Sequence, residues 1–239
     1  CTAALHLALL ACGIGTGDEV IPTPMTFIAT ATAILHTGAK PVFVDVEADT
    51  GLIDPNRVEE AISSKTKAII PVHLYGTMAD MQALKRIGDR HGLFIIEDSA
   101  HCIEGSRDGI RPGDLSDAAC FSFYATKNLT CGEGGALATN SKELAQIIRT
   151  LRQHGMSKEA ADRYHGNYKH WDMIELGWKY NLNDIHAALL IDQLDRLDQY
   201  WERRNSIWAL YDKGLQDVPG IRIPETRGKS GKHLYTIWV

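Results

Sequence analysis

The stretch TKAIIPVHLYGTMADMQALKRIGDRHGLFIIED, residues 66–98, contains two short apolar runs separated by an amphipathic segment. The runs AIIPVHL and FIIED have the length of buried strands, and residues 79–90 between them carry apolar side chains at helical spacing. Two parallel strands need a crossover of this kind, usually a helix. The stretch therefore predicts a strand, a helix and a second, parallel strand.

The same alternation continues outward from this stretch in both directions. Towards the N-terminus we expect strands at EVIPTP and PVFVDV and helices at 3–11, 26–36 and 55–63. Towards the C-terminus we expect strands at 119–123 and 136–139, a helix at 141–153, a polar loop at 155–180 and a long helix at 184–215. Such alternation predicts an α/β fold with a mostly parallel central sheet flanked by helices.

The last part of the chain indicates a second domain. We predict a large domain over residues 1–183, then a linking helix and the start of a smaller C-terminal α/β domain over residues 184–239, with LYTIWV as an edge strand. Apolar residues of the long helix recur at threes and fours, which predicts packing along one face. The chain begins without methionine and stops inside the expected strand, so we expect an internal fragment.

Composition narrows the class of partner. The net charge of -5 is spread over mixed acidic and basic residues, so no basic stripe points to nucleic acid or a membrane surface. The five cysteines lack paired, metal-type spacing, which favours a reduced cytoplasmic setting and no metal site. No apolar run approaches the roughly 18 residues of a membrane span. A small diffusible ligand fits best.

Polar residues gather where the predicted strands end. Asp45, His73 and Asp98 lie at or near the ends of three strands, and ligands collect at such carboxyl ends in open sheets. In FSFYATKNLTCGEGGALAT, residues 121–139, Lys127 lies between a strand and a glycine-rich turn. Lys127 can be a solvated loop lysine, an ion-pair partner or a desolvated amine.

An acid at the end of a buried strand, followed roughly thirty residues later by this lysine, suits pyridoxal phosphate chemistry. The lysine amine forms a Schiff base with the aldehyde, and a carboxylate keeps the pyridine nitrogen protonated so that the ring absorbs carbanion charge. Asp98 and Lys127 are the candidates. The helix start at Thr2 and Ala3 and the hydroxyl of Ser122 could hold the phosphate.

Each of these residues also has an ordinary structural explanation. Asp98 could be a helix cap or turn residue, and Ser122 an inward-facing strand residue. His101 could be a capping or core histidine as readily as a site residue. Phe27 and His73, taken singly, suit the core.

Taken together and in order, the motifs resemble one family, the DegT/DnrJ/EryC1/StrS sugar aminotransferases of PLP fold type I. The matching motifs are CTAALH, GDEVIPTPMTFIATATAI, PVFVDV, TKAIIPVHLYG, FIIEDSAH, FSFYATKNLTCGEGG and GWKYNLNDIHAALLIDQL. They cover nearly the whole chain. The resemblance is specific because EDSAH and SFYATKNLTCGEGG occur together at the family's spacing.

The resemblance implies roles for individual residues. Lys127 is similar to the Schiff-base lysine, which also moves the proton between cofactor and sugar carbon. Asp98 matches the pyridinium partner, and Phe27 stands where an aromatic ring stacks on the cofactor, although tryptophan is expected there. Three further residues stand at phosphate-binding positions: Thr2, Ala3 and Ser122.

Two more positions carry finer implications. Asn181 is similar to the asparagine that reaches the phosphate from the other subunit, which implies a homodimer. His101, a cofactor-binding position, is a histidine in many members that act at C4 of a nucleotide-linked keto sugar, and glutamine in many that act at C3. The motifs are most similar to those of members that make UDP-4-amino-4-deoxy-L-arabinose for lipopolysaccharide modification.

We therefore expect a cytoplasmic, homodimeric aminotransferase that moves an amino group, with glutamate as the expected donor, to a 4-keto nucleotide sugar. Sister members that dehydrate at C3 carry histidine instead of the lysine, and this chain has Lys127. Two alternatives stay open: action at C3 or on a cyclitol ketone, and a non-catalytic regulator that binds the cofactor. The intact set of Lys127, Asp98 and Ser122 disfavours the regulator.

Overall fold

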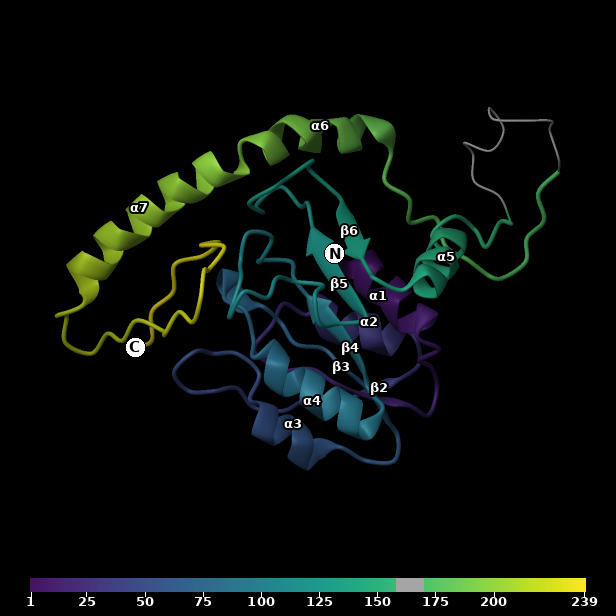
Figure 1. Ribbon diagram of the computed structural model, residues 1–239, viewed down its shortest axis with the longest axis horizontal. Helices are drawn as coiled ribbons and strands as arrows, with labels where there is room; N and C mark the ends of the chain where they lie inside the picture. The colour runs from purple at the N-terminus through teal and green to yellow at the C-terminus, as the bar shows by residue number, and fades with distance from the viewer. Residues whose placement is uncertain (158–169) are drawn as a thin grey trace.

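The computed structural model describes residues 1–157 and 170–239, and a six-stranded sheet lies between layers of helices (Figure 1). The strands are β1 Glu19–Ile21, β2 Lys40–Pro41, β3 Thr66–Ile69, β4 Phe94–Asp98, β5 Ala118–Ser122 and β6 Gly135–Ala138. The α-helices are α1 Thr2–Ala11, α2 Ala29–His36, α3 Pro55–Ala61, α4 Met81–His91, α5 Lys142–Leu151, α6 Asp184–Asp195 and α7 Leu197–Leu215.

The strand order is β2-β1-β3-β4-β5-β6, and each neighbouring pair is parallel except β5 and β6. The predicted mostly parallel sheet is thus confirmed. β6 is antiparallel because it follows β5 through the glycine-rich loop that carries Lys127, without a crossover helix. This hairpin places the lysine loop at the carboxyl end of β5.

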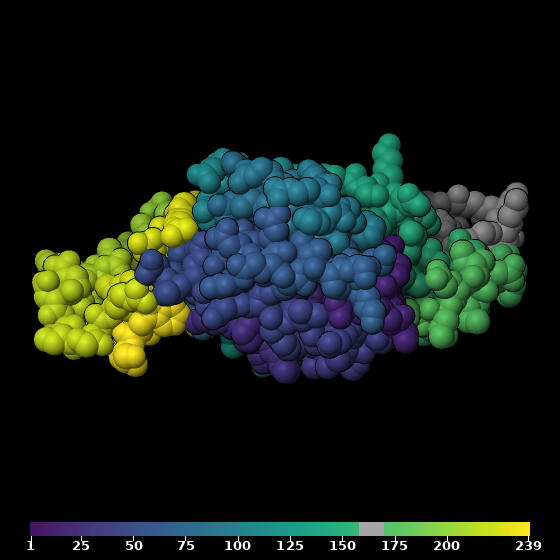
Figure 2. Space-filling model, turned by 90° about the horizontal axis from the view of Figure 1, so that it is seen from below, coloured from purple at the N-terminus to yellow at the C-terminus, as the bar shows by residue number. Residues whose placement is uncertain are grey.

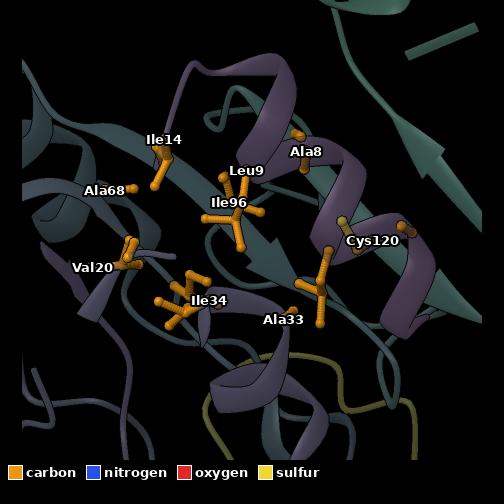
Figure 3. Packing of buried hydrophobic residues seen from close by; sticks show 14 residues of the cluster. Ala8, Leu9, Ile14, Val20, Ala33, Ile34, Ala68, Ile96 and Cys120 are labelled. Atoms are coloured by element: carbon orange, nitrogen blue, oxygen red, sulfur yellow. The ribbon is translucent and has the colours of Figure 1, made fainter. Parts of the chain in front are cut away.

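Helices cover both faces of the sheet. Neighbouring residues of a strand point to opposite faces, so each strand contributes to two sets of buried contacts. Val20 and Ile96 pack with Leu9 and Ile34 from α1 and α2, as Figure 3 shows. The other face packs against α3 and α4 through a second set of buried residues: Ile21, Val58, Ile69, Leu84, Ile87 and Ile95. Parallel strands buried on both faces read as the continuous apolar runs seen in the sequence.

Short polar side chains begin several helices. Asp54 accepts from the backbone N–H of Asn56 and precedes Pro55, the first residue of α3. Asp80 caps α4, which therefore starts at Met81 rather than at the predicted residue 79. At the other end of α4, Gly92 adopts a φ of 65°, a left-handed conformation that glycine reaches without strain.

Some predicted elements differ from the structure. In PVFVDV only Pro41 lies within β2, although the backbone N–H groups of Val42 and Val44 still donate to Val20 and Pro22. The opposing chain contains Pro22, and because proline has no N–H to return, the ladder becomes one-sided there. This explains why the regular pairing ends early.

The predicted single helix at 184–215 is also wrong in one respect. Arg196, with φ -102° and ψ 5°, separates α6 from α7. No residue of α7 is buried, so the expected packing along one face is limited to partial contacts. LYTIWV does not form a strand, and Trp238 instead makes an isolated antiparallel bridge with Arg222. Part of the predicted loop at 155–180, residues 158–169, lies outside the described residues.

The chain after α7 returns to the sheet-bearing part of the molecule, as Figures 1 and 2 show. Arg222 pairs with Asp49 at 2.6 Å, and the N–H of Gly231 donates to the carbonyl of Gly76 at 2.8 Å. The division into domains at residue 183 stays a prediction. Among the helices of the described part of the chain, none is long and apolar enough to cross a membrane.

Candidate active site

A cavity of about 710 Å³ lies at the carboxyl ends of the central strands. Six of the eight predicted site residues line it: Thr2, Phe27, Asp98, His101, Ser122 and Lys127. They come from the start of α1, the segment after β1, the ends of β4 and β5, and the loops that follow those two strands. The strand ends thus bring together residues far apart in the sequence, while their individual roles stay predictions.

Asp98 is the last residue of β4 and only 5% of it is exposed. One carboxylate oxygen accepts from the hydroxyl of Thr30 at 2.7 Å, and the other accepts from the backbone N–H of Ala100 at 3.2 Å. A buried carboxylate costs free energy unless it is hydrogen-bonded. The thiol of Cys1 also donates to the second oxygen, at 3.7 Å, and these donors together hold the carboxylate in one orientation beside the cavity.

Lys127 faces the same cavity from the loop after β5. Burial lowers the pKa of its amine, and the charge of Asp98 opposes that effect by raising it. The desolvation is the larger of the two influences. A lysine with a lowered pKa carries a larger fraction of neutral, nucleophilic amine, which distinguishes Lys127 from a solvated loop lysine.

His101 lies in a stack of three rings. Its ring lies 6.1 Å from that of Tyr75, nearly parallel at 9°, and 4.5 Å from that of His233. Its Nδ1 accepts from the backbone N–H of Tyr75 at 3.2 Å. Burial, followed by the neighbouring titratable ring of His233 and the positive charge of Lys127, lowers the pKa of His101 to about 3, so the ring is neutral at neutral pH.

Phe27 is 71% exposed, which is unusual for a phenylalanine and contradicts the core interpretation of this residue. Because it lines the cavity, its ring offers an apolar face to a planar ligand. Ser122, also on the cavity wall, accepts weakly from the N–H of Tyr124 at 3.4 Å, and Thr2 is the first residue of α1. The first N–H groups of a helix suit an anion such as phosphate.

Ala3 and Asn181 line a neighbouring cavity of about 710 Å³, which shares Thr2 and the glycine-rich turn with the first. Among the described residues, the buried Oδ1 of Asn181 has no hydrogen-bond partner. In a single chain this asparagine therefore does not reach the cavity of Lys127. Its predicted reach into a partner's site is not tested by one chain.

Two strand-end residues considered from the sequence lie away from the cavity. His73 is fully buried, with its Nε2 2.5 Å from a carboxylate oxygen of Glu97, and its Nδ1 accepts from the N–H of Ala79. Asp45 accepts from the N–H of Val46 next to it. Both have structural partners of their own.

Sequence reasoning missed three residues that organise the site. Thr30 fixes Asp98, Tyr75 holds His101, and His233 approaches from the C-terminal segment. Tyr75 has a φ of 55°, a left-handed conformation that is rare outside glycine, and nothing in the motif LYG signals it. A hydroxyl in the first turn of α2, close to the aromatic Phe27, was the one available signal for Thr30.

A hydrogen-bonded buried carboxylate, a lysine with a lowered pKa and an exposed aromatic ring surround one cavity, and this donor set fits pyridoxal phosphate. On a mostly parallel sheet with helices on both faces, the arrangement is that of a PLP fold type I protein. The chain belongs to the DegT/DnrJ/EryC1/StrS aminotransferase family, whose profile matches residues 1–239. The predicted family is confirmed, and so is pyridoxal phosphate as the family's cofactor.

Individual relatives agree with this membership. The chain is 47% identical to the spore coat polysaccharide biosynthesis protein SpsC of Bacillus subtilis, over all of this chain and 62% of that protein. DesV of S. venezuelae superposes with a TM-score of 0.91 at 41% identity, over 99% of this chain and 62% of DesV. The putative sugar aminotransferase Spr1654 of Streptococcus pneumoniae, in its PMP form, superposes at 0.90 with 34% identity, over 98% of this chain and 64% of that one. The chain thus spans somewhat less than two thirds of these relatives.

Proposed function

We propose that the full-length protein is a pyridoxal-phosphate-dependent aminotransferase that moves an amino group from glutamate to the C4 keto group of a nucleotide-linked sugar. One observation carries the proposal. Lys127, whose pKa is lowered by burial, and the oriented carboxylate of Asp98 line the same cavity. Family membership supports amino transfer as the reaction.

The residues of this chain divide the chemistry between them. When bound, pyridoxal phosphate supplies an aldehyde that captures amines and a ring that accepts negative charge. The carboxylate of Asp98, fixed by Thr30 and Ala100, would keep a proton on the pyridine nitrogen. The neutral amine of Lys127 would accept the proton from the α-carbon of the donor and return a proton to the sugar carbon.

Other residues would bind and orient. The exposed ring of Phe27 would cover one face of the cofactor ring, and the first N–H groups of α1 with the hydroxyl of Ser122 would hold the phosphate.

Asn181 would reach the phosphate of a partner subunit, so that the functional unit is a homodimer. Mixed dimers with Asn181→Ala in only one subunit test this: the expected loss is at the opposite site, and a loss confined to the variant's own site contradicts it.

A sugar substrate is supported by the relatives, since SpsC is named for polysaccharide biosynthesis and Spr1654 as a putative sugar aminotransferase. His101 supports action at C4 because of the resemblance to C4-acting members. A panel of 3-keto and 4-keto nucleotide sugars and cyclitol ketones tests this choice. If only a 3-keto sugar or a cyclitol ketone is turned over, the proposal of action at C4 is wrong. We also propose that the enzyme works in the cytoplasm, where nucleotide sugars are made.

Borohydride reduction of the full-length protein with bound cofactor, followed by peptide mass spectrometry, tests the central role of Lys127. We expect the pyridoxyl group on Lys127 alone. Lys232 is an internal control, because burial lowers its pKa too but it lies over the ring of Trp208, at 4.2 Å, outside the lining of the cavity. A pyridoxyl group on Lys232, or on any lysine other than Lys127, would overturn the mechanism.

A further inference from the structure

The C-terminal segment forms part of the cavity's surroundings. Its residue Leu234 lines the cavity directly, and the backbone N–H of the preceding His233 donates to the carbonyl of Tyr75 at 3.1 Å. The segment is also anchored by the indole N–H of Trp201 in α7, which donates to the carbonyl of Ser230 at 2.7 Å. The contacts with Tyr75 and with Trp201 therefore fix the backbone of this segment, and with it His233, beside His101.

The side chain of His233 has a defined tautomer. Asn128, next to the active-site lysine, donates from its amide nitrogen to a carboxylate oxygen of Glu104 at 2.9 Å and to the carbonyl of Gly231 at 2.7 Å. Both partners only accept, so the amide oxygen of Asn128 is the atom that faces Nδ1 of His233, at 3.0 Å. Nδ1 must then carry the proton. Glu104 is in turn paired with Arg204 of α7.

The tautomer of His101 follows from the same reasoning. Its Nδ1 accepts from the N–H of Tyr75, so the single proton of the neutral ring lies on Nε2. Within the described residues, no hydrogen bond to this Nε2–H is present. Because His101 lines the cavity, Nε2–H is available as a donor to a ligand there.

Two rings hold His101 in this orientation. The centroid of the Tyr75 ring lies 6.1 Å from that of His101. The centroid of the His233 ring lies 4.5 Å from it, with an interplanar angle of 30°. Among the described residues, the charged or titratable groups around the stack include Lys127, Arg204, the carboxylate of Glu104 and the phenol of Tyr75. Burial, with the nearby charges of Lys127 and Arg204, lowers the pKa of His233 to about 4, so both stacked imidazoles are uncharged and do not repel each other.

We propose that His233 is a positioning residue of the cofactor site: Asn128 fixes its ring, and the ring holds His101 so that the Nε2–H of His101 is presented to the cavity. The inference rests on the proposed function only in taking the cavity as the cofactor site. His233 contacts Asn128 in the loop that carries Lys127, and Asn128 contacts Glu104, which pairs with Arg204 of α7. These contacts join the C-terminal segment and α7 to the lysine loop.

Two substitutions separate the two contacts of His233. His233→Gln keeps a side-chain N–H for Asn128 but lacks the ring, and His233→Phe keeps a ring to stack on His101 but lacks the donor. Each retains one contact with the rest of the chain, which favours a folded protein. Tyr235→Phe is the matched control, because this hydroxyl donates to Asp212 at 2.8 Å, in the same segment but away from the cavity.

The test is NMR of the full-length, cofactor-free protein labelled with ¹⁵N in its histidine rings. In the wild type we expect His101 as the Nε2–H tautomer. In His233→Gln the ring of His101 is no longer held by the stack against the N–H of Tyr75. We therefore expect that bond to be only partly occupied, giving a mixture of tautomers and an upward shift of the His101 titration by about one pH unit or more, because water reaches the ring. His233→Phe and Tyr235→Phe should keep the wild-type tautomer.

A second measurement is the affinity of each variant for pyridoxal phosphate. We expect His233→Gln to bind about 2- to 10-fold more weakly, the effect of losing one aromatic contact, and Tyr235→Phe to bind as the wild type does. The proposal is overturned if His101 in His233→Gln keeps its wild-type tautomer and titration, or if His233→Phe disturbs it equally. Failure of the wild type to bind pyridoxal phosphate would instead remove the proposed function, while the tautomer of His101 would still decide the role of His233.

Discussion

Replacing Thr30 by valine removes one hydroxyl at nearly constant side-chain shape, and that hydroxyl donates to Asp98 at 2.7 Å. Thr30 is fully buried and Asp98 is 5% exposed, so water does not replace the lost donor. A hydrogen bond to a charged group contributes about 1.5–3 kcal/mol to stability. That corresponds to about a 10- to 150-fold change in the folding equilibrium, or roughly 3–12 °C in Tm for a chain of this size.

The assay is urea and thermal unfolding of the cofactor-free, full-length protein, followed by titration with pyridoxal phosphate. Asp98 loses its orientation in Thr30→Val, so affinity for the cofactor should fall with stability, whereas Thr30→Ser keeps the donor. Thr32→Val is the control in the same helix, because its hydroxyl donates to a backbone carbonyl, that of Ala29, at 3.3 Å. Equal losses of stability and affinity in Thr30→Val and Thr32→Val would refute the reasoning.

Three further changes give distinct results. Burial lowers the pKa of Lys127 in the folded protein. Between that lowered pKa and the ordinary value of about 10.4, the unfolded chain binds more protons than the folded one, so stability rises with pH. Lys127→Met should flatten this rise in the urea midpoints, and an unchanged slope would contradict the role of Lys127. Phe27→Ala should weaken cofactor binding by about 0.5–1.5 kcal/mol in a titration, with Phe27→Trp as the aromatic control and no change in Tm, because Phe27 is mostly exposed. His73→Leu leaves the buried carboxylate of Glu97 without its histidine and should cost about 3–5 kcal/mol by urea unfolding; adding Glu97→Leu should recover part of the loss, and strict additivity would show that the pair is not coupled.

The layered fold could be predicted from the sequence because its signal is local. Ile69 and Ile95 stand in apolar runs that alternate with helical segments, and burial on both faces of a parallel sheet produces that pattern. The early end of regular pairing at Pro41 depends on a proline in the neighbouring strand, Pro22, and the break at Arg196 has no breaker residue to announce it. Pairing partners and helix breaks of this kind are not local properties.

The site was predictable where a residue stands at the end of a strand. Asp98 and Lys127 meet at one cavity because the carboxyl ends of neighbouring parallel strands lie at one edge of the sheet. Thr30 and His233 were missed because their contacts with Asp98 and His101 join segments far apart along the chain. The intersubunit role of Asn181 stays a prediction, since one chain does not contain the partner.

The return of the C-terminal segment to the sheet has a kinetic consequence. Gly76 and Gly231 are 155 positions apart in the sequence, and Asp49 and Arg222 are 173 apart, so the contacts of this segment join distant parts of the chain. Closing such long loops costs conformational entropy before any contact offsets it, so we expect the segment to dock late in folding. A chain that has formed its sheet but has not yet docked the C-terminal segment lacks Leu234 in the lining of the cavity. Binding of the cofactor during refolding would then report the docking of this segment and not the earlier formation of the sheet.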